Sequence, residues 1–240
     1  MVRKTICNTI CNTVRHANRN VVHPMLICLS AISLIVVSQS ISRGQSLADV
    51  PAGELKGQFD GYLENVRDSL KDEAKYGKAQ QEGVEKDAST LMVLSQVLAG
   101  RDDGGDWKKH HPAVIAAAGE LASKSGDYAG AQAALTQLEK AIQEVTESDA
   151  DDVRADIAVL MKQVPIVNGR MRRGVTGRRF DRSLDEIAGT ALTLAAIAEV
   201  TKNDDTYCSD DEGKAEWTKI SEQMRDAAMG VHAATRAKNQ

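Results

Sequence analysis

Apolar residues recur every three or four positions along most of this chain, and no segment shows the alternation of apolar and polar residues that marks a strand. Such spacing places apolar side chains on one face of an α-helix. The chain has only two Phe, two Trp, four Tyr and four Pro in 240 residues, which disfavours β-sandwiches and barrels. We therefore expect an all-α protein, built as an up-and-down helical bundle with short connections.

The first half of the pattern predicts several helices. One begins after Pro51 and runs to Leu70, and the apolar pattern of residues 84–98 either continues it or forms a second helix. Pro112 suits the first position of the next helix, because proline lacks the N–H that a first turn leaves unused. Asp127 is a good N-cap for a helix whose inner face comprises Ala131, Leu135, Leu138, Ile142 and Val145.

The second half continues in the same way. Ser148 and Asp151 resemble a capping box, and the helix that follows should kink or end at Pro165. Ser183 is a further N-cap, and the last helix extends from the acidic loop 203–212 through Trp217 to Val231. Both halves contain a helix, an acidic loop, a Trp and an Ala-Ala-x-Gly-x-x-Ala segment. This internal similarity has two explanations. The chain contains a duplicated helical hairpin, with halves 84–147 and 183–240, or the two segments share only an Ala-rich composition.

The first 44 residues resemble an export signal. Arg3, Lys4, Arg15 and Arg19 precede a short apolar run over residues 25–37, and small residues follow it. The run is shorter than the roughly 20 residues of a comfortable transmembrane helix. We expect cleavage after Ser40 or Gly44, a periplasmic or secreted location, and no stable membrane span afterwards. The alternative is an uncleaved N-terminal membrane anchor.

Cleavage would change the charge and the inventory of reactive residues. Residues 1–44 hold five basic residues and no acid, so residues 45–240, the expected helical-bundle domain, hold 25 basic and 34 acidic residues. A chain this acidic is a poor general binder of nucleic acid. Cys208 is the single cysteine after residue 44, which excludes an intrachain disulfide there, and the histidines are His110, His111 and His232.

His232 is a candidate cofactor ligand, because four-residue steps back from it reach Ala228 and Met224 on the apolar face of the last helix. An inward imidazole in a helical bundle can ligate haem iron with a methionine opposite, for which Met224 and Met92 are candidates. The alternative is a boundary histidine that bonds a carbonyl or water, with the methionines filling the core.

The segment Asp127-Tyr128, followed by Ala131, Ala134, Leu135 and Leu138, resembles the last helix of exported four-helix cytochromes of the cytochrome c-prime kind. In that family a Cys-x-x-Cys-His haem-attachment motif stands at the end of this helix, whereas residues 141–145 here are Ala-Ile-Gln-Glu-Val. The resemblance therefore implies either a haem-less bundle or non-covalent haem, bound as in soluble b-type cytochromes through a Met and a His.

The densest charge feature is an arginine cluster in an otherwise acidic chain. Guanidinium groups at a connection between helices can hold a phosphate, a carboxylate or a haem propionate. They can equally neutralise helix C-termini and pair with Asp181, Asp185 and Glu186. The candidate anion-binding residues are Arg170, Arg172, Arg173, Arg178 and Arg179.

Other chemistry is poorly supported. Adjacent His110 and His111 project about 100° apart on a helix and are badly placed to share a metal ion, and the acidic loops lack calcium-loop spacing. No nucleophile-elbow, phosphate-loop or zinc-protease motif occurs. Acids around Cys208 should raise its pKa. We expect an exported, non-catalytic binding or scaffold protein whose partner is a protein or a small anion; the alternative is a periplasmic electron-transfer protein with non-covalent haem.

Overall fold

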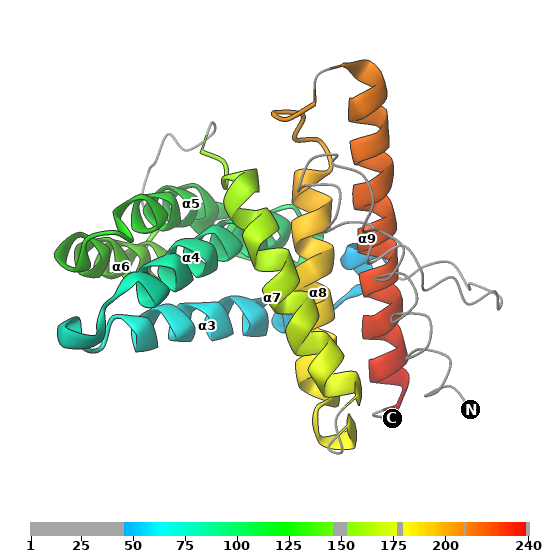
Figure 1. The fold of residues 1–240 in the computed structure, drawn as a ribbon, viewed down its shortest axis with the longest axis horizontal. Coiled ribbons are helices and arrows are strands. Elements are labelled where there is room, and N and C mark those ends of the chain that lie inside the picture. The colour runs from blue at the N-terminus through cyan, green and yellow to red at the C-terminus, as the bar shows by residue number, and fades with distance from the viewer. Residues whose placement is uncertain (1–45, 146–152, 177–179, 209, 239–240) are drawn as a thin grey trace, which may run out of the picture. The chain divides into compact units, whose positions relative to one another are not determined.

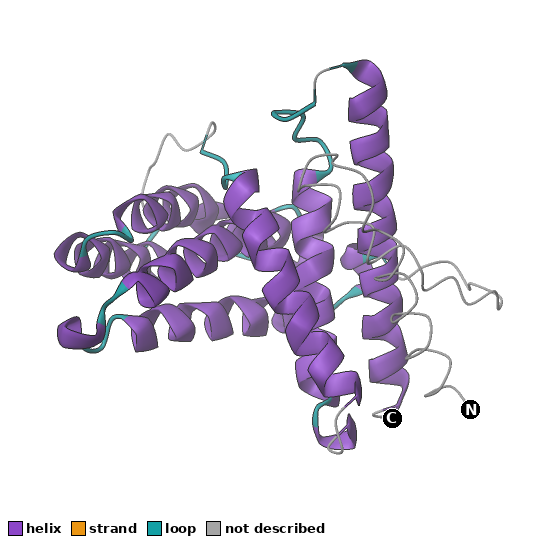
Figure 2. Cartoon of the chain, in the orientation of Figure 1, coloured by secondary structure: helices purple, strands orange, loops and turns teal. Residues whose placement is uncertain are grey.

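The computed structural model describes residues 46–145, 153–176, 180–208 and 210–238. These residues are helical wherever they have regular structure, and no strand occurs among them (Figure 2). The all-α class expected from the sequence is confirmed. The chain divides into two compact units, an N-terminal unit of Ala48–Val164 and a C-terminal unit of Pro165–Gln240.

The N-terminal unit is an up-and-down arrangement of four helices, drawn from cyan to green in Figure 1. Sequential helices pack against each other, and side-chain hydrogen bonds connect the first helix and the residue after it with the last. The Tyr128 hydroxyl donates to Leu70 O at 3.0 Å, and Arg67 Nε donates to Glu139 at 2.8 Å. The four helices are α3 (Ala52–Ser69), α4 (Lys78–Ala99), α5 (Trp107–Lys124) and α6 (Tyr128–Gln143).

Short 3-10 turns connect or precede these helices: η1 (Leu47–Asp49), η2 (Glu73–Lys75) and η3 (Asp102–Gly104). The turn η2 separates α3 from α4, so the first apolar pattern forms two helices and not one. Arg101, only 8% exposed, ties the start of the unit to its middle. Its guanidinium bonds Asp103 and donates to Ala48 O, while the Ala52 N–H donates to Asp103.

The helix α5 begins five residues before the proline that was expected to start it. Trp107 Nε1 donates to Ser95 at 3.1 Å, and His110 Nδ1 lies 3.1 Å from Ala141 O. These contacts hold the first turn in place. Pro112 removes only the bond that its N–H would make to Lys108 O, four residues earlier in an exposed first turn. The loss is therefore small.

Asp127 caps α6 as expected, its carboxylate accepting the Gly130 N–H at 2.7 Å. A Cβ at Gly130 would lie 2.8 Å from the same carboxylate, so the glycine makes room for the cap. The expected inner face is correct as far as Leu138 and wrong beyond it. The helix ends at Gln143, Ile142 is half-buried and Val145 is 58% exposed, while Ala141 takes the buried position.

The C-terminal unit contains α8 (Leu184–Thr201) and α9 (Asp211–Lys238), which pack side by side (Figure 1, yellow and red). The second half of α7 (Ile157–Thr176) joins them, because a Cβ on Gly174 would lie 2.7 Å from the Ile187 side chain. The capping box expected at Ser148 and Asp151 lies outside the described residues. Ser183 occupies the N-cap position of α8.

Pro165 was one expected end of this helix, but α7 continues through it to Thr176. Proline removes the bond that residue 165 would donate to Met161 O. Residue 165 is exposed, so water can donate a hydrogen bond to that carbonyl.

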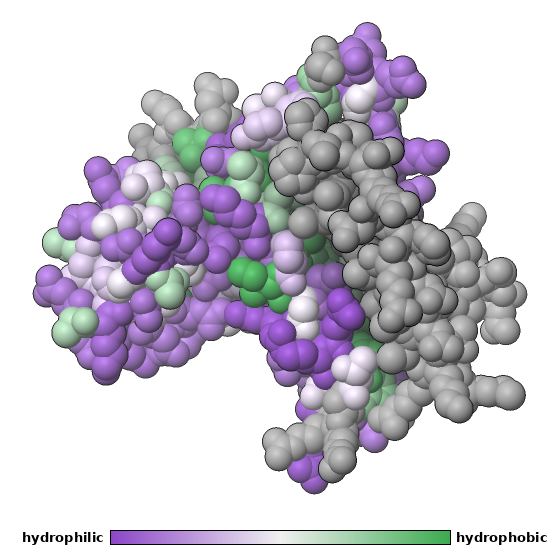
Figure 3. Space-filling view, viewed as in Figure 1, coloured by the Kyte–Doolittle hydropathy of each residue, from purple (hydrophilic) through white to green (hydrophobic). Residues whose placement is uncertain are grey.

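Hydrophilic side chains cover most of the described surface in Figure 3. None of the described helices combines the length and the apolar character needed to cross a membrane.

Candidate functional site

Four arginines gather where α7 ends and α8 begins. Arg172, Arg173 and Arg182 are exposed and Arg170 is half-buried. Arg182 belongs to the turn η4 (Phe180–Arg182), which leads into α8. The helix α7 contains no acidic residue over its whole length, and Arg173 lies in its last turn, where the C-terminal end of the helix dipole favours a cation. We call Arg170, Arg172, Arg173 and Arg182 the arginine end of the C-terminal unit; Arg178 and Arg179 lie outside the described residues.

The acids beside the arginine end are engaged by another helix. Asp181 accepts from Lys238 Nζ at 3.2 Å, and Asp185 forms an ion pair with Arg236, both cations coming from the last turn of α9. Lys238 Nζ also lies 4.2 Å from the centre of the Phe180 ring. Pairing of the arginine cluster with Asp181 and Asp185 was one reading of the sequence. In the structure these two acids form ion pairs with Arg236 and Lys238 of α9 instead.

The arginine end consequently keeps its charge. Among the described residues, no carboxylate lies within ion-pair distance of any of its four guanidinium groups, whereas most other described lysines and arginines have such a partner. Arg173 Nη1 lies 3.5 Å from the position that a Cβ of Gly169 would occupy, so its side chain lies back along α7. Like charges within one turn of a helix repel each other, and a bound anion would relieve that repulsion.

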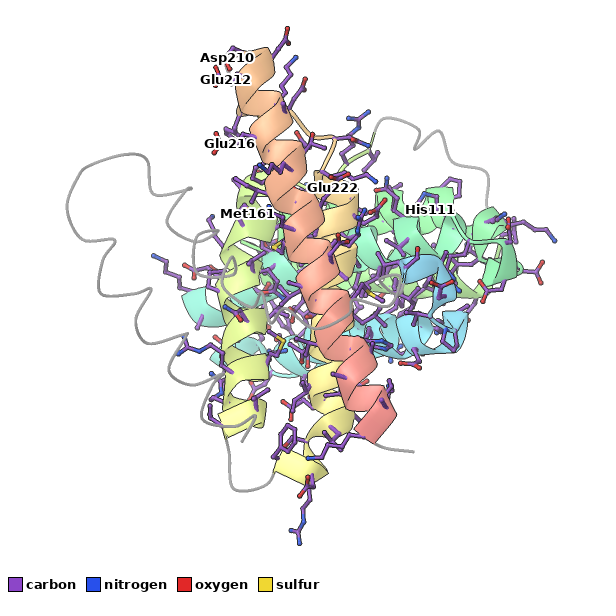
Figure 4. All side chains as sticks on the ribbon, turned by 90° about the vertical axis from the view of Figure 1, so that its right-hand side faces the viewer. His111, Met161, Asp210, Glu212, Glu216 and Glu222 are labelled. Carbon is purple, nitrogen blue, oxygen red and sulfur yellow. The ribbon has the colours of Figure 1, made fainter. Side chains whose placement is uncertain are left out.

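The opposite end of the C-terminal unit is acidic. Asp210, Glu212 and Glu216 stand at the start of α9 (Figure 4), where Lys214 pairs with Asp205 at 2.9 Å. Trp217 closes this end, since its Nε1 donates to Thr201 O at 2.8 Å. At a rise of about 1.5 Å per residue, the 28 residues of α9 separate the two ends by about 40 Å. Opposite charges thus occupy opposite ends of one unit.

His232 and Met224 are both buried on α9, with 1% and 3% of their surfaces exposed. They lie eight residues apart on one continuous helix, which places them about 12 Å apart along its axis. The two axial ligands of a haem stand on opposite faces of one iron atom, so these two side chains do not fit as a pair. A haem held by His232 would need a methionine from another helix.

Met92 belongs to α4 of the N-terminal unit and is 3% exposed. Its thioether packs against α5, because a Cβ on Gly119 would lie 3.6 Å from the Met92 methyl group and 3.3 Å from Val153. The methionine fills the gap that the glycine leaves between the helices. This contact gives Met92 a packing role, and its candidacy as an iron ligand remains a prediction.

The two adjacent histidines diverge. His110 Nδ1 lies near Ala141 O on α6, whereas His111 Nδ1 lies 3.1 Å from Ser95 Oγ on α4. Ser95 is fully buried, and its hydroxyl accepts the Trp107 N–H and also lies within hydrogen-bond distance of His111. Burial lowers the pKa of His111. Sequence reasoning missed this chain of bonds, although a serine between Leu91 and Leu98 on an apolar face was a signal for it.

The remaining reactive group is weakly reactive. Burial, and secondarily the charge of Asp205, raises the pKa of the half-buried Cys208 thiol. The sequence predicted that the pKa of Cys208 is raised by nearby acids; in the structure burial is the larger cause of this increase. No group of three or more His, Cys, Asp or Glu side chains within the described ranges is arranged to hold a metal ion.

No protein-family model, curated protein or solved structure matches this chain. The resemblance to cytochromes of the c-prime kind therefore stays a prediction, and the site's own geometry is the basis for a functional proposal.

Proposed function

We propose that this chain is an exported, non-catalytic binding protein that holds an anionic ligand or partner at its arginine end. One observation carries the proposal: four arginines at one end of the C-terminal unit have no carboxylate partner among the described residues, although the chain is acidic overall. Of the three acids beside the cluster, Asp181 and Asp185 pair with Lys238 and Arg236, and Glu186 forms no ion pair within the described residues. An anion is the group that these guanidiniums are best suited to bind.

The chemistry of arginine favours binding over catalysis. A guanidinium stays protonated throughout the physiological range and offers several N–H donors in a fixed plane, which suits phosphate and carboxylate oxygens. It does not exchange a proton near neutral pH, so it is a poor general acid or base. Bound anions would also stabilise the end of α7, where the repulsion between Arg170 and Arg173 is a local cost.

A calorimetric titration with inorganic tripolyphosphate tests this proposal. Replacing the four arginines by Gln should weaken binding by about tenfold or more, because charge-assisted bonds are lost. The affinity of the unaltered protein should fall steeply between about 50 mM and about 200 mM salt, since exposed charges are screened. Circular dichroism spectra of the variants confirm that they remain folded.

The matched control removes four positive charges elsewhere. Lys71, Lys75, Lys78 and Lys108 are exposed residues of the N-terminal unit, and their joint replacement by Gln changes the net charge equally. This control should bind tripolyphosphate within about twofold of the unaltered protein. Equal weakening in the two variants would show a general charge effect and would refute an arginine site.

The second candidate is non-covalent haem, and the burial of His232 is the observation that favours it. Titration with haemin should then give a saturable one-to-one Soret spectrum that His232→Ala abolishes. Because Met224 lies on the same helix, Met224→Leu should leave that spectrum unchanged. A haemin spectrum that the protein does not alter would end this candidate.

A further inference from the structure

Two of the three arginines of α7, Arg172 and Arg173, lie on an exposed face of the helix together with an exposed apolar residue. At 100° per residue, the exposed positions of this half of α7 fall within an arc of about 120°. Ile166, 37% exposed, lies two turns before Arg173 on that arc, and Gly169 between them carries no side chain. The full set of exposed positions is Pro165, Ile166, Arg172, Arg173 and Thr176.

This arrangement suits an extended array of phosphates better than one small anion. Arg172 and Arg173 diverge by about 100°, and Arg182 comes from a different element. Guanidiniums that diverge over a convex face reach several separate anionic groups more readily than one small anion. The headgroups of a phospholipid surface present many phosphates side by side, so each guanidinium can meet its own, while an exposed apolar side chain enters the interface.

The acidic end does not cancel the attraction. It stands about 40 Å from the arginine end along α9, which is several Debye lengths at physiological salt. An anionic surface therefore attracts the arginine end and repels the start of α9, where Asp210, Glu212 and Glu216 stand (Figure 4). The charge separation orients the C-terminal unit even though the chain is acidic overall.

We propose that the arginine end, with Ile166 beside it, docks on the anionic phospholipid headgroups of a membrane surface. This inference rests on the proposed anion-binding function and names its ligand. The export signal expected over residues 1–44 brings the chain to a membrane, so phospholipid is the anionic surface that it meets. Binding of this kind is peripheral and needs no spanning helix.

Vesicle sedimentation tests the inference, using the protein in the form recovered after export. It should bind vesicles of phosphatidylcholine mixed with phosphatidylglycerol and bind pure phosphatidylcholine at least about tenfold more weakly, with the difference lost at high salt. Replacing Arg170, Arg172, Arg173 and Arg182 by Gln should remove the preference. The quadruple lysine variant, Lys71, Lys75, Lys78 and Lys108 to Gln, should keep it.

Ile166→Ser separates a lipid surface from a dissolved anion. It should weaken binding to the mixed vesicles by about threefold, because an apolar contact is lost, and leave tripolyphosphate binding unchanged. Equal binding to both vesicle types, or an unaltered preference in the arginine variant, would overturn the lipid inference. If tripolyphosphate binding still depends on the arginines in that case, the proposed function stands; if it does not, both fail.

Discussion

Burial lowers the pKa of His111, whose Nδ1 lies 3.1 Å from the Ser95 hydroxyl oxygen. In the unfolded chain a histidine titrates near pH 6.5. Below that pH His111 is protonated in the unfolded chain but stays largely neutral in the folded chain until the pH reaches its lower folded pKa. The stability associated with neutral His111 is therefore present above about pH 6.5 and is lost as the pH falls through the folded pKa.

The variant His111→Asn tests this. Asn keeps a hydrogen-bonding group near the position of Nδ1 but does not titrate. We expect the free energy of unfolding of the unaltered protein, minus that of the variant, to decrease as the pH falls from about 7 to about 5, with a slope of at most about 1.4 kcal/mol per pH unit. Urea titrations at several pH values measure the difference. Parallel stability curves for the two proteins would contradict the assignment.

At the level of the helix, two glycines of the C-terminal unit test how α7 packs. Gly174 on α7 faces Ile187, which would lie 2.7 Å from an added Cβ, whereas Gly230 on α9 is exposed and has nothing within 4 Å of that position. Gly174→Ala should destabilise the protein by about 1–3 kcal/mol through overpacking. Gly230→Ala should stabilise it by about 0.5–1 kcal/mol, because alanine favours a helix interior.

Urea unfolding measures both variants under the same conditions. The two substitutions are chemically identical and differ only in what surrounds the glycine, so helix propensity alone predicts stabilisation in both. A stabilising Gly174→Ala would mean that α7 does not approach α8 as closely as the Ile187 contact requires.

Helix periodicity predicted these elements well where the burial was one-sided. Leu55, Phe59 and Leu63 are all buried on α3 as their spacing required. The errors arise where tertiary contacts decide a boundary. Trp107 and His110 extend α5 ahead of Pro112 because Ser95 and Ala141, on other helices, hold that first turn. The sequence around Pro112 does not reveal these partners, because they lie on other helices.

The candidate site was also predictable only in part, because its residues are visible in the sequence and their tertiary partners are not. The density of arginines over residues 170–182 is visible in the sequence. Their lack of partners is not, since it depends on Lys238 pairing with Asp181 from 57 residues away and on Arg236 pairing with Asp185 from 51 residues away. Local charge counting left pairing with these acids as one of two alternatives, and in the structure Asp181 and Asp185 pair with residues of α9 instead.

In the whole molecule, each of the two units carries one of the two tryptophans. Trp107 in the N-terminal unit packs edge-on against Phe59, with the ring centres 4.9 Å apart, and bonds Ser95. Trp217 in the C-terminal unit bonds the carbonyl of Thr201. The variants Trp217→Phe and Trp107→Phe therefore leave one fluorescent reporter in one unit each. They allow the stability of each unit to be followed separately.

We expect Gly174→Ala to lower the urea midpoint reported by Trp217 and to leave the midpoint reported by Trp107 within error. The reason is that Ile187 and Ser183, the side chains crowded by the new methyl group, both belong to the C-terminal unit, while the N-terminal unit is held by contacts among its own helices. Equal shifts of both midpoints would instead mean that the continuous helix α7 makes the chain unfold as one cooperative body. Tripolyphosphate adds the converse test: a ligand at the arginine end should raise the midpoint reported by Trp217 first, because binding stabilises the unit that holds the site.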